Sequence, residues 1–366
     1  MPLPFTPLIE TLPSSVPFVG PEALERRTGT MFRVRIGANE SVFGPSPKVV
    51  TAMQQAAAEV WQYCDPENHD LKAALAKHLG VGPENVMVGE GIDGLFGYAV
   101  RLFVEPGVTV ATSLGAYPTF NFHVQGFGGR LVTMPYVNDR EDPQSLLDLA
   151  TREKARLIYF ANPDNPMGSW WPAASVGDFI ARLPEGALLM LDEAYGEFSP
   201  EGTLPPLDVS NPNVLRFRTF SKAYGMAGMR LGYCVGHASL ITAFDKIRNH
   251  FGVTRMGQAA GVAALEDQTH LRNVVTKVAA ARDEISGIAR GNGLVPLASA
   301  ANFVTIDCGR DGAYAKRVLD ALVAAGVFVR MPGVAPLNRC IRVTAGTAAD
   351  LAIFADELPK ALKAAG

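Results

Sequence analysis

One segment of the sequence isolates a lysine and an arginine among small, hydroxylic and glycine residues. Residues 219–233 read TFSKAYGMAGMRLGY, and Lys222 and Arg230 carry the charges of that segment. A lysine with a lowered pKa is a nucleophile suited to Schiff-base chemistry. Ser221 beside it and Arg230 eight residues on could hold a phosphate. A Ser-Lys pair taken singly is more typical of a solvated surface, so the lysine needs partners before it indicates chemistry.

Two further segments place polar groups directly after apolar runs. LMLDEAYGEF (189–198) ends an apolar run in Asp192 and Glu193, where burial of a carboxylate is costly without a cationic partner. ANPDNPMG (161–168) follows the run ARLIYF, and its two Asn-Pro pairs predict a stiff turn that presents the amide of Asn165. The ordinary alternatives are a helix-capping acid and an Asx turn.

A glycine-rich turn offers a phosphate site but is a poor dinucleotide motif. GEGIDG (89–94) matches GxGxxG, yet the next predicted strand ends in Ser113 and Leu114, with no acid for a ribose hydroxyl. The sequence therefore disfavours nicotinamide binding. The amides of Gly91, Ile92 and Asp93, at the start of a predicted helix, could still bind a phosphate.

Seven short apolar runs alternate with helical segments and predict the element that positions these groups. The runs are residues 85–91, 108–113, 130–136, 155–162, 187–195, 214–220 and 230–236. Such alternation is typical of an α/β domain with a largely parallel sheet, covered by helices on both faces. Ligands of such sheets bind beyond the carboxyl ends of the strands, where the polar groups above are expected.

The pattern along the chain predicts three regions. Residues 1–33 contain a proline-rich stretch and are expected to form an irregular N-terminal arm. Residues 34–264 are expected to form the large domain, with the first of them joining the small domain. Residues 265–366 have an α+β pattern that predicts a smaller C-terminal domain, with helices at 271–294 and 313–326 and strands within 301–309, 327–333 and 340–346.

Composition narrows the class of protein. The net charge of the 366-residue chain is −3, so nothing favours nucleic acid or a membrane surface as a partner. The four cysteines have no CxxC spacing, which indicates a reducing compartment, and the six histidines show no metal-ligand spacing. MPLPFTPLIETLPSS has neither a basic start nor a long apolar core, so we expect no signal peptide. A cytoplasmic protein without a metal is the expectation.

Taken together, the motifs predict one cofactor. A phosphate-binding turn, an amide donor, a carboxylate and a lysine each follow a predicted strand. A pyridoxal phosphate site needs a Schiff-base lysine and an acid beside the pyridine nitrogen.

At these residues the chain resembles the fold-type I pyridoxal-phosphate aminotransferases, and among them the histidinol-phosphate aminotransferase group most closely. The resemblance runs in order from about residue 34 to residue 347. It is carried by GANESVFGPSP (37–47), YCDPENHDLKAALA (63–76), NPDNPMG, DEAYGEF, SKAYGMAGMRLGY, ANFV (301–304), VRMPG (329–333) and IRVTAGT (341–347). It implies a large domain with a mostly parallel seven-stranded sheet and a smaller α+β domain.

The resemblance implies a role for each residue that faces the cofactor ring. Lys222 would form the Schiff base and then move the proton, and Asp192 would pair with the pyridine nitrogen. Asn165 and Tyr195 would hydrogen-bond the phenolic oxygen, and Tyr117 would stack on the ring.

Other residues are implied to hold the phosphate. Ser221, Arg230 and the amides of Ile92 and Asp93 would bind it within the chain. Tyr63 would reach it from a partner subunit, so the resemblance implies a homodimer.

The resemblance also implies substrate contacts and an activity. Arg342 would bind the carboxylate of an amino acid, and Arg330 and Asn39 would be further contacts. The implied reaction moves an amino group between an amino donor and a 2-oxo acid, with histidinol phosphate and 2-oxoglutarate expected first. Gly94 and Met167 depart from the family pattern, which usually has glutamate and threonine there.

Alternatives remain open on the sequence. They are a pyridoxal-phosphate decarboxylase of a phosphorylated amino acid and an aminotransferase for aromatic or other amino acids. A nicotinamide-dependent oxidoreductase and a binding protein without activity are disfavoured by the missing acid and by the intact lysine and aspartate.

Overall fold

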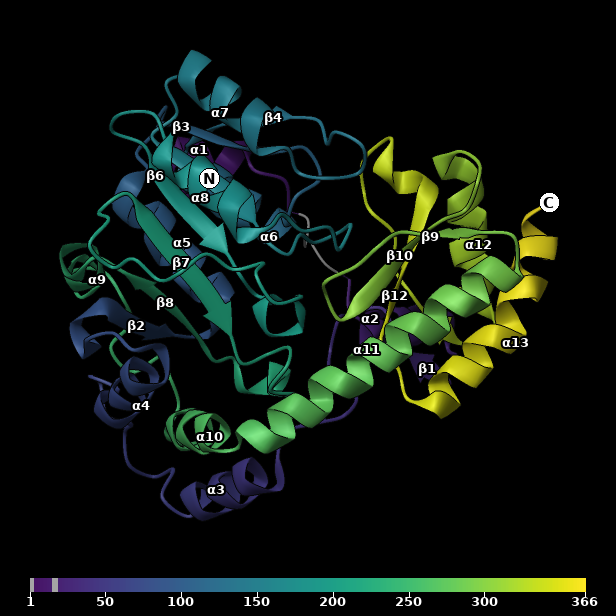
Figure 1. The fold of residues 1–366 in the computed structure, drawn as a ribbon, viewed down its shortest axis with the longest axis horizontal. Coiled ribbons are helices and arrows are strands. Elements are labelled where there is room, and N and C mark those ends of the chain that lie inside the picture. The colour runs from purple at the N-terminus through teal and green to yellow at the C-terminus, as the bar shows by residue number, and fades with distance from the viewer. Residues whose placement is uncertain (1–2, 15–18) are drawn as a thin grey trace.

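The computed structural model describes residues 3–14 and 19–366, and a seven-stranded sheet lies at the centre of the described chain (Figure 1). Its strand order is β2-β8-β7-β6-β5-β3-β4. The strands are β2 (Val86–Gly89), β3 (Thr109–Ser113), β4 (Arg130–Met134), β5 (Leu157–Ala161), β6 (Leu188–Asp192), β7 (Val214–Thr219) and β8 (Gly232–Gly236). The pairs among β3 to β7 are parallel, whereas β8 is antiparallel to both of its neighbours. The predicted α/β class and each predicted strand of this sheet are confirmed.

The central strands are apolar because both faces of the sheet are covered by helices. Along β5, Ile158 and Phe160 pack into one hydrophobic cluster, while Leu157 and Tyr159 pack into a second. This alternation is the two-residue period of a strand, here with both faces buried. The covering helices include α5 (Gly91–Phe103), α6 (Pro118–Gly126), α7 (Pro143–Arg152), α8 (Ala173–Ala181) and α9 (Ala238–Phe244).

The C-terminal part forms a second, antiparallel sheet with the order β12-β10-β9. Its strands are β9 (Val295–Pro296), β10 (Phe303–Asp307) and β12 (Cys340–Thr344), with α12 (Gly312–Ala324) and α13 (Ala348–Ala365) beside them. The predicted strand at 327–333 is shorter and lies elsewhere. It is β11 (Val327–Phe328), which pairs in parallel with β1 (Val34–Arg35). The division of the chain at residue 264 stays a prediction.

Helices link the two sheets and flank the first. The long helix α11 (Gln268–Gly291) runs from α10 (Arg255–Glu266) to the smaller sheet (Figure 1). Helices α3 (Pro47–Ala57) and α4 (His69–Leu79) pack against α10. In the described part of the chain, no helix is both long and apolar enough to cross a membrane.

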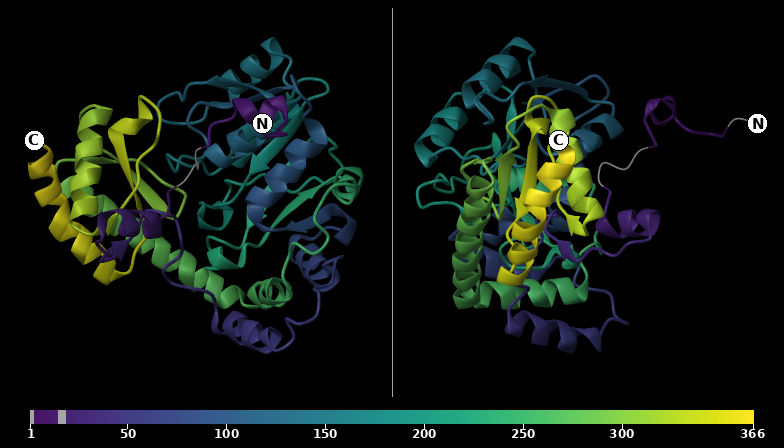
Figure 2. Two further views of the ribbon diagram at one scale, coloured as in Figure 1. Left: turned by 180° about the vertical axis from the view of Figure 1, so that it is seen from behind. Right: turned by 90° about the vertical axis from the view of Figure 1, so that its right-hand side faces the viewer.

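The expected irregular N-terminal arm is wrong where the structure describes it. The arm contains α1 (Pro7–Thr11) and α2 (Pro21–Thr28). Pro7 and Pro21 each begin a helix, a position whose N–H needs no partner within the helix, so proline is compatible there. The part of the prediction on residues 1–2 and 15–18 lies outside the described residues. Figure 2 shows α1 projecting from the body of the molecule.

Candidate active site

A cavity of about 470 Å³ lies at the carboxyl ends of the central strands. Strands β5, β6 and β7 end at its wall, and the smaller sheet closes it from the other side. Parallel strands bring their carboxyl ends to one edge, which is why polar residues far apart in sequence meet there. Twelve of the thirteen predicted site residues line it: Asn39, Ile92, Asp93, Tyr117, Asn165, Asp192, Tyr195, Ser221, Lys222, Arg230, Arg330 and Arg342.

Lys222 follows β7 and projects its amine into this cavity. Its Nζ donates a hydrogen bond to the backbone oxygen of Asn39 at 3.0 Å and lies 5.8 Å from the centre of the Tyr195 ring. Burial, followed by the positive charge of Arg342, lowers the pKa of Lys222 to about 8. The amine is therefore substantially neutral, and so nucleophilic, at a mildly alkaline pH.

Asp192 ends β6 and is buried with neutral hydrogen-bond donors. Tyr159 Oη donates to Oδ2 at 2.6 Å, and the amide of Ala194 donates to Oδ1 at 2.9 Å. Burial raises the pKa of Asp192 to about 6, while both hydrogen bonds oppose that rise. A carboxylate held in this way can still be neutralised by a cationic group of a ligand.

The glycine turn and Arg230 form an anion-binding corner. Gly91 begins α5 with φ +75°, and a Cβ at that position would lie 2.5 Å from Arg230 Nη2. Glycine therefore lets the start of the helix and the guanidinium approach one another. Arg230 Nη1 lies 3.5 Å from Ser221 Oγ. The free amides at the start of this helix and a cation suit a phosphate.

Asn39 supports both the lysine and a tyrosine. Its Nδ2 donates to Tyr195 Oη at 3.0 Å, and Thr344 Oγ1 donates to its Oδ1 at 3.0 Å. The residue is buried in the left-handed conformation, with φ 57°, which asparagine tolerates better than most residues. The sequence suggested a substrate contact and missed this bridging position, because the folded chain brings the partners together from three distant segments.

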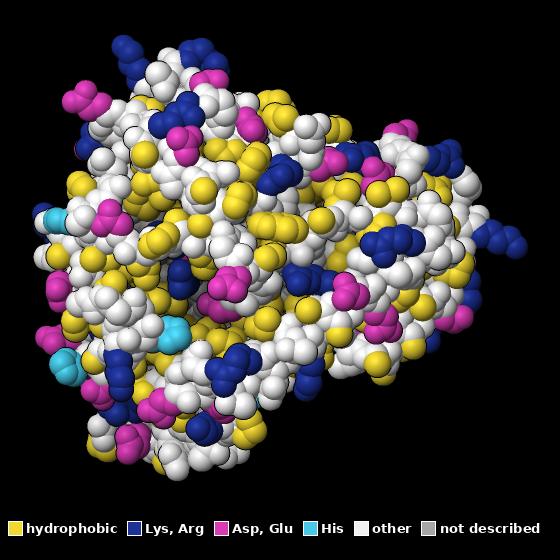
Figure 3. Space-filling model, viewed as in Figure 1, with side chains coloured by type: hydrophobic (Ala, Val, Ile, Leu, Met, Phe, Trp, Pro, Cys, Tyr) yellow, Lys and Arg dark blue, Asp and Glu magenta, His cyan; other side chains and the backbone are white. Residues whose placement is uncertain are grey.

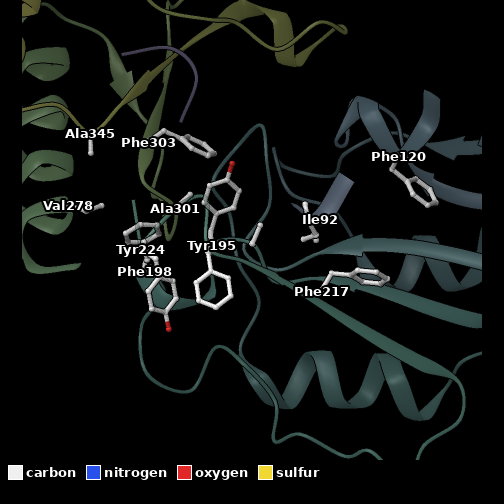
Figure 4. Packing of buried hydrophobic residues seen from close by; sticks show 14 of the residues in the cluster. Ile92, Phe120, Tyr195, Phe198, Phe217, Tyr224, Val278, Ala301, Phe303 and Ala345 are labelled. Atoms are coloured by element: carbon white, nitrogen blue, oxygen red, sulfur yellow. The ribbon is translucent and has the colours of Figure 1, made fainter. Parts of the chain in front are cut away.

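Tyr195 and Arg342 form the side of the cavity nearest the smaller sheet. Burial raises the pKa of Tyr195 to about 12 and lowers the pKa of Arg342 to about 10. Arg342 donates to the side-chain oxygen of Asn165 and to the backbone oxygen of Gly37. Its Nε is buried without a hydrogen-bond partner in the described structure. Figure 4 shows the Tyr195 ring beside Phe303, at a centroid distance of 5.5 Å.

Tyr63 is the predicted site residue that does not line the cavity. Its side chain is exposed, with a relative accessibility of 80%, and its ring lies 4.9 Å from that of Phe251. Tyr159, in contrast, contacts Asp192 directly and was missed. A tyrosine in the apolar run ARLIYF is a weak signal, since its hydroxyl needs a buried partner.

Arg330 and Tyr117 also line the cavity. Arg330 Nη2 donates to the backbone oxygen of Val19 at 2.9 Å, so the N-terminal segment contacts the cavity wall. Tyr117 lies edge-on to Phe96, with ring centroids 6.4 Å apart.

The residues present fit pyridoxal phosphate. The glycine turn leaves the space that a Cβ would fill, and the corner there suits a phosphate. Lys222 has a lowered pKa. Asp192 accepts from neutral donors, so its carboxylate has no countercharge among them and could pair with a cationic ring nitrogen.

Fold and site together define an aminotransferase, and comparison with known families agrees. The family model for aminotransferase class I and II matches residues 33–358, and the chain belongs to this family. Within it, the chain is similar to proteins named histidinol-phosphate aminotransferase. The one from Carboxydothermus hydrogenoformans is 33% identical over 97% of this chain and 98% of its own, and the one from Anaeromyxobacter sp. is 35% identical over 93% and 94%.

A solved structure is more similar still. It is the histidinol-phosphate aminotransferase from Sinorhizobium meliloti in complex with pyridoxal-5'-phosphate. The two chains are 56% identical, with a TM-score of 0.97, over 99% of this chain and 98% of that one. The resemblance drawn from the sequence is confirmed.

Proposed function

We propose that the protein is a pyridoxal-phosphate-dependent aminotransferase that moves an amino group between histidinol phosphate and a 2-oxo acid such as 2-oxoglutarate. The observation that carries this proposal is the meeting of Lys222 and Asp192 with an anion-binding corner in one cavity. The similarity to histidinol-phosphate aminotransferases supports the substrate and does not favour a decarboxylase.

Five groups would hold the cofactor phosphate and ring. Ser221, Arg230 and the amides of Ile92 and Asp93 would bind the phosphate, since they surround the corner at the start of α5. Tyr117 would lie against the ring.

The remaining contacts would be made to the polar atoms of the ring. Asp192 would keep the pyridine nitrogen protonated, and Tyr195 and Asn165 would donate to the phenolic oxygen. Bound there, pyridoxal phosphate supplies an electron sink for the electron pair left when a substrate carbon loses its proton.

The chain's own residues would then bind the substrate and move a proton. The neutral amine of Lys222 would accept the proton from the substrate carbon and then donate it to the cofactor carbon that is bonded to the transferred nitrogen. Its pKa of about 8 lets it act as a base and then as an acid. Arg342 would bind the carboxylate of the 2-oxo acid. Arg330 and Asn39 would contact the substrate at the same wall.

We infer that the active form is a homodimer in the cytoplasm. Trp61 and Tyr63 are each 80% exposed, and in the N-terminal segment Leu3, Phe5 and Ile9 are also exposed, so a second copy has apolar side chains to cover. In such a dimer, Tyr63 of each copy would reach the anion-binding corner of the other copy. The four cysteines are free, which is in keeping with a reducing compartment.

An absorption spectrum of the purified protein with pyridoxal phosphate tests the proposal. We expect a visible band from the cofactor bound to Lys222, bleached by histidinol phosphate and restored by 2-oxoglutarate. Lys222→Ala is the control and should show no such band. Histidinol, which lacks the phosphate, should bleach the band far less. A band that glutamate bleaches and histidinol phosphate leaves unchanged would reject the substrate but keep the amino transfer.

A further inference from the structure

A second cavity, of about 510 Å³, lies between the two sheets and shares no lining residue with the active-site cavity. We call it the seam cavity. It is lined by the segment that follows β4 (138–140), by part of the segment that follows β5 (167–172), and by Leu297 and Ala298 between β9 and β10. On the face drawn in Figure 3, hydrophobic side chains reach the surface between the two parts of the molecule. A cavity of this size is within the usual range of small-molecule sites.

The walls of the seam cavity are held in place by contacts between the two sheets. Thr305 Oγ1 donates to the backbone oxygen of Pro166 at 2.7 Å. The amide of Ala300 donates to the backbone oxygen of Gly168 at 2.8 Å. Arg339 donates to both carboxylate oxygens of Asp139, at 3.0 and 2.7 Å. The cavity is therefore bounded by backbone and ion-pair contacts rather than by a loose loop.

Arg140 gives the cavity a cation whose charge is not neutralised. Its guanidinium stacks on Trp171 at 3.9 Å and donates to the backbone oxygen of Trp170. Its Nε is buried without a hydrogen-bond partner, and no carboxylate of a described residue forms an ion pair with it. Burial lowers the pKa of Arg140, and the negative charge of Asp142 opposes this lowering. Asp142 itself accepts a hydrogen bond from the amide of Ser145.

The rest of the lining is chiefly apolar. Trp170, Pro172 and Leu297 contribute hydrophobic surface. Asp139 contributes a carboxylate, but both of its oxygens already accept from Arg339. An unneutralised guanidinium beside an apolar wall is complementary to a small anion with an apolar body.

We propose that the seam cavity is a ligand site for a small monocarboxylate that carries an aromatic or branched aliphatic group. The carboxylate pairs with Arg140, and the apolar group packs on Trp170, Pro172 and Leu297. Because the lining comes from both sheets, an occupant contacts both parts of the molecule at once. The proposal does not depend on the reaction proposed for the active site.

Tryptophan fluorescence of the cofactor-loaded protein tests this site, since Trp170 and Trp171 are two of the three tryptophans in the chain. The probe is 3-phenylpropanoate, with 3-phenylpropanamide as its uncharged match. We expect saturable quenching by the acid and at least roughly tenfold weaker binding of the amide, because the charged hydrogen bond is lost. Trp61→Phe should keep the quenching.

Two variants separate the seam cavity from other binding. Arg140→Gln removes the charge and should weaken acid binding at least about tenfold. Ala298→Phe adds bulk at an exposed residue of the lining and should also weaken it, which covers the case that Arg140→Gln fails to fold. Arg342→Lys alters the active site and should leave the quenching intact. Equal binding of acid and amide, or quenching that survives both seam variants and is lost in Arg342→Lys, would overturn the proposal.

Discussion

Asp192 and Glu193 are neighbouring residues at the end of β6, and both are buried, yet their surroundings differ. Glu193 accepts from Arg216 at 3.0 and 2.5 Å and from Arg218 at 2.9 Å. Asp192 accepts from a tyrosine hydroxyl and a backbone amide. One carboxylate is neutralised within the protein, and the other has its charge left for a ligand.

This difference separates a structural acid from a functional one. A buried carboxylate without a cation is costly for the folded state, so a fold has no reason to keep one unless something else uses the charge. The alternation of a strand sends the two side chains to opposite faces, and only the face toward the cavity can meet a ligand. Burial and acidity alone would not distinguish these residues, whereas the identity of their donors does.

Asp192→Asn should give the largest effect on activity. If Asp192 neutralises the cofactor nitrogen, its loss removes a buried charge pair, and we expect kcat/KM to fall roughly a thousandfold. Steady-state assays with histidinol phosphate and 2-oxoglutarate measure this.

The same variant should not destabilise the protein without cofactor. The folded-state pKa of about 6 lies above the ordinary value of 3.8, so the folded form binds the proton more tightly and its stability falls as the pH rises from about 4 to about 6. Above that window the wild type carries a penalty of about 3 kcal/mol that Asp192→Asn lacks. Urea unfolding of the apoprotein at low and neutral pH compares the two. A variant that is less stable at neutral pH would show that Asp192 has a structural role like that of Glu193.

Glu193→Gln should show the opposite pattern. It leaves Arg216 and Arg218 buried without a countercharge, so we expect a loss of about 3 kcal/mol in the free energy of unfolding. The kcat of the protein that remains folded should change by less than about tenfold, since the side chain faces away from the cavity. Glu201→Gln, at an exposed position, is the matched control and should leave both unchanged. A loss of activity as large as in Asp192→Asn, with unchanged stability, would contradict the division.

The sequence predicted the part of this arrangement that depends on strand ends. Asp192 and Lys222 each follow an apolar run, and a parallel sheet brings such positions to one edge. The seven strands were predictable for the same reason, since their apolar runs are short and distinct. The proline-rich composition of the N-terminal arm indicates an irregular segment and hides its helices, because Pro7 and Pro21 stand at helix starts, where proline is favoured.

What the sequence could not predict are contacts between segments far apart in the chain. Asn39 meets Tyr195 and Thr344 across separations of 156 and 305 residues, and a pattern within one segment carries no record of them. Tyr159 belongs to the same class, since its hydroxyl finds Asp192 only when two strands pair. The arginine partners of Glu193 also come from another strand, so its structural role was not visible.

Tyr159→Phe sharpens the comparison by removing one of the neutral donors to Asp192. The hydroxyl hydrogen bond lowers the pKa of the carboxyl, so its loss should raise that pKa above about 6 and move the acid limb of the pH–rate profile upward. We expect kcat/KM to fall about tenfold at neutral pH. The ring should stay stacked on Phe120, so thermal unfolding should change little. An unshifted acid limb would mean that Asp192 does not set it.

Two cations, Arg218 and Lys222, show the same contrast and give the smallest expected effect. Glu193 raises the pKa of Arg218, whereas Lys222 donates to a backbone oxygen and has its pKa lowered to about 8. The neutral amine is the form that attacks an aldehyde, so the rate at which apoprotein binds pyridoxal phosphate should rise with pH and level off above about 8. Arg342→Met removes the positive charge that is the second cause of the lowering, so the midpoint of this rise should move to higher pH. Stopped-flow absorbance across a pH series measures both midpoints. The variant leaves Lys222 in place, so a midpoint that does not move would mean that burial alone lowers the pKa of the lysine. The difference between Lys222 and Arg218 would then rest on the solvation of the lysine rather than on a neighbouring charge.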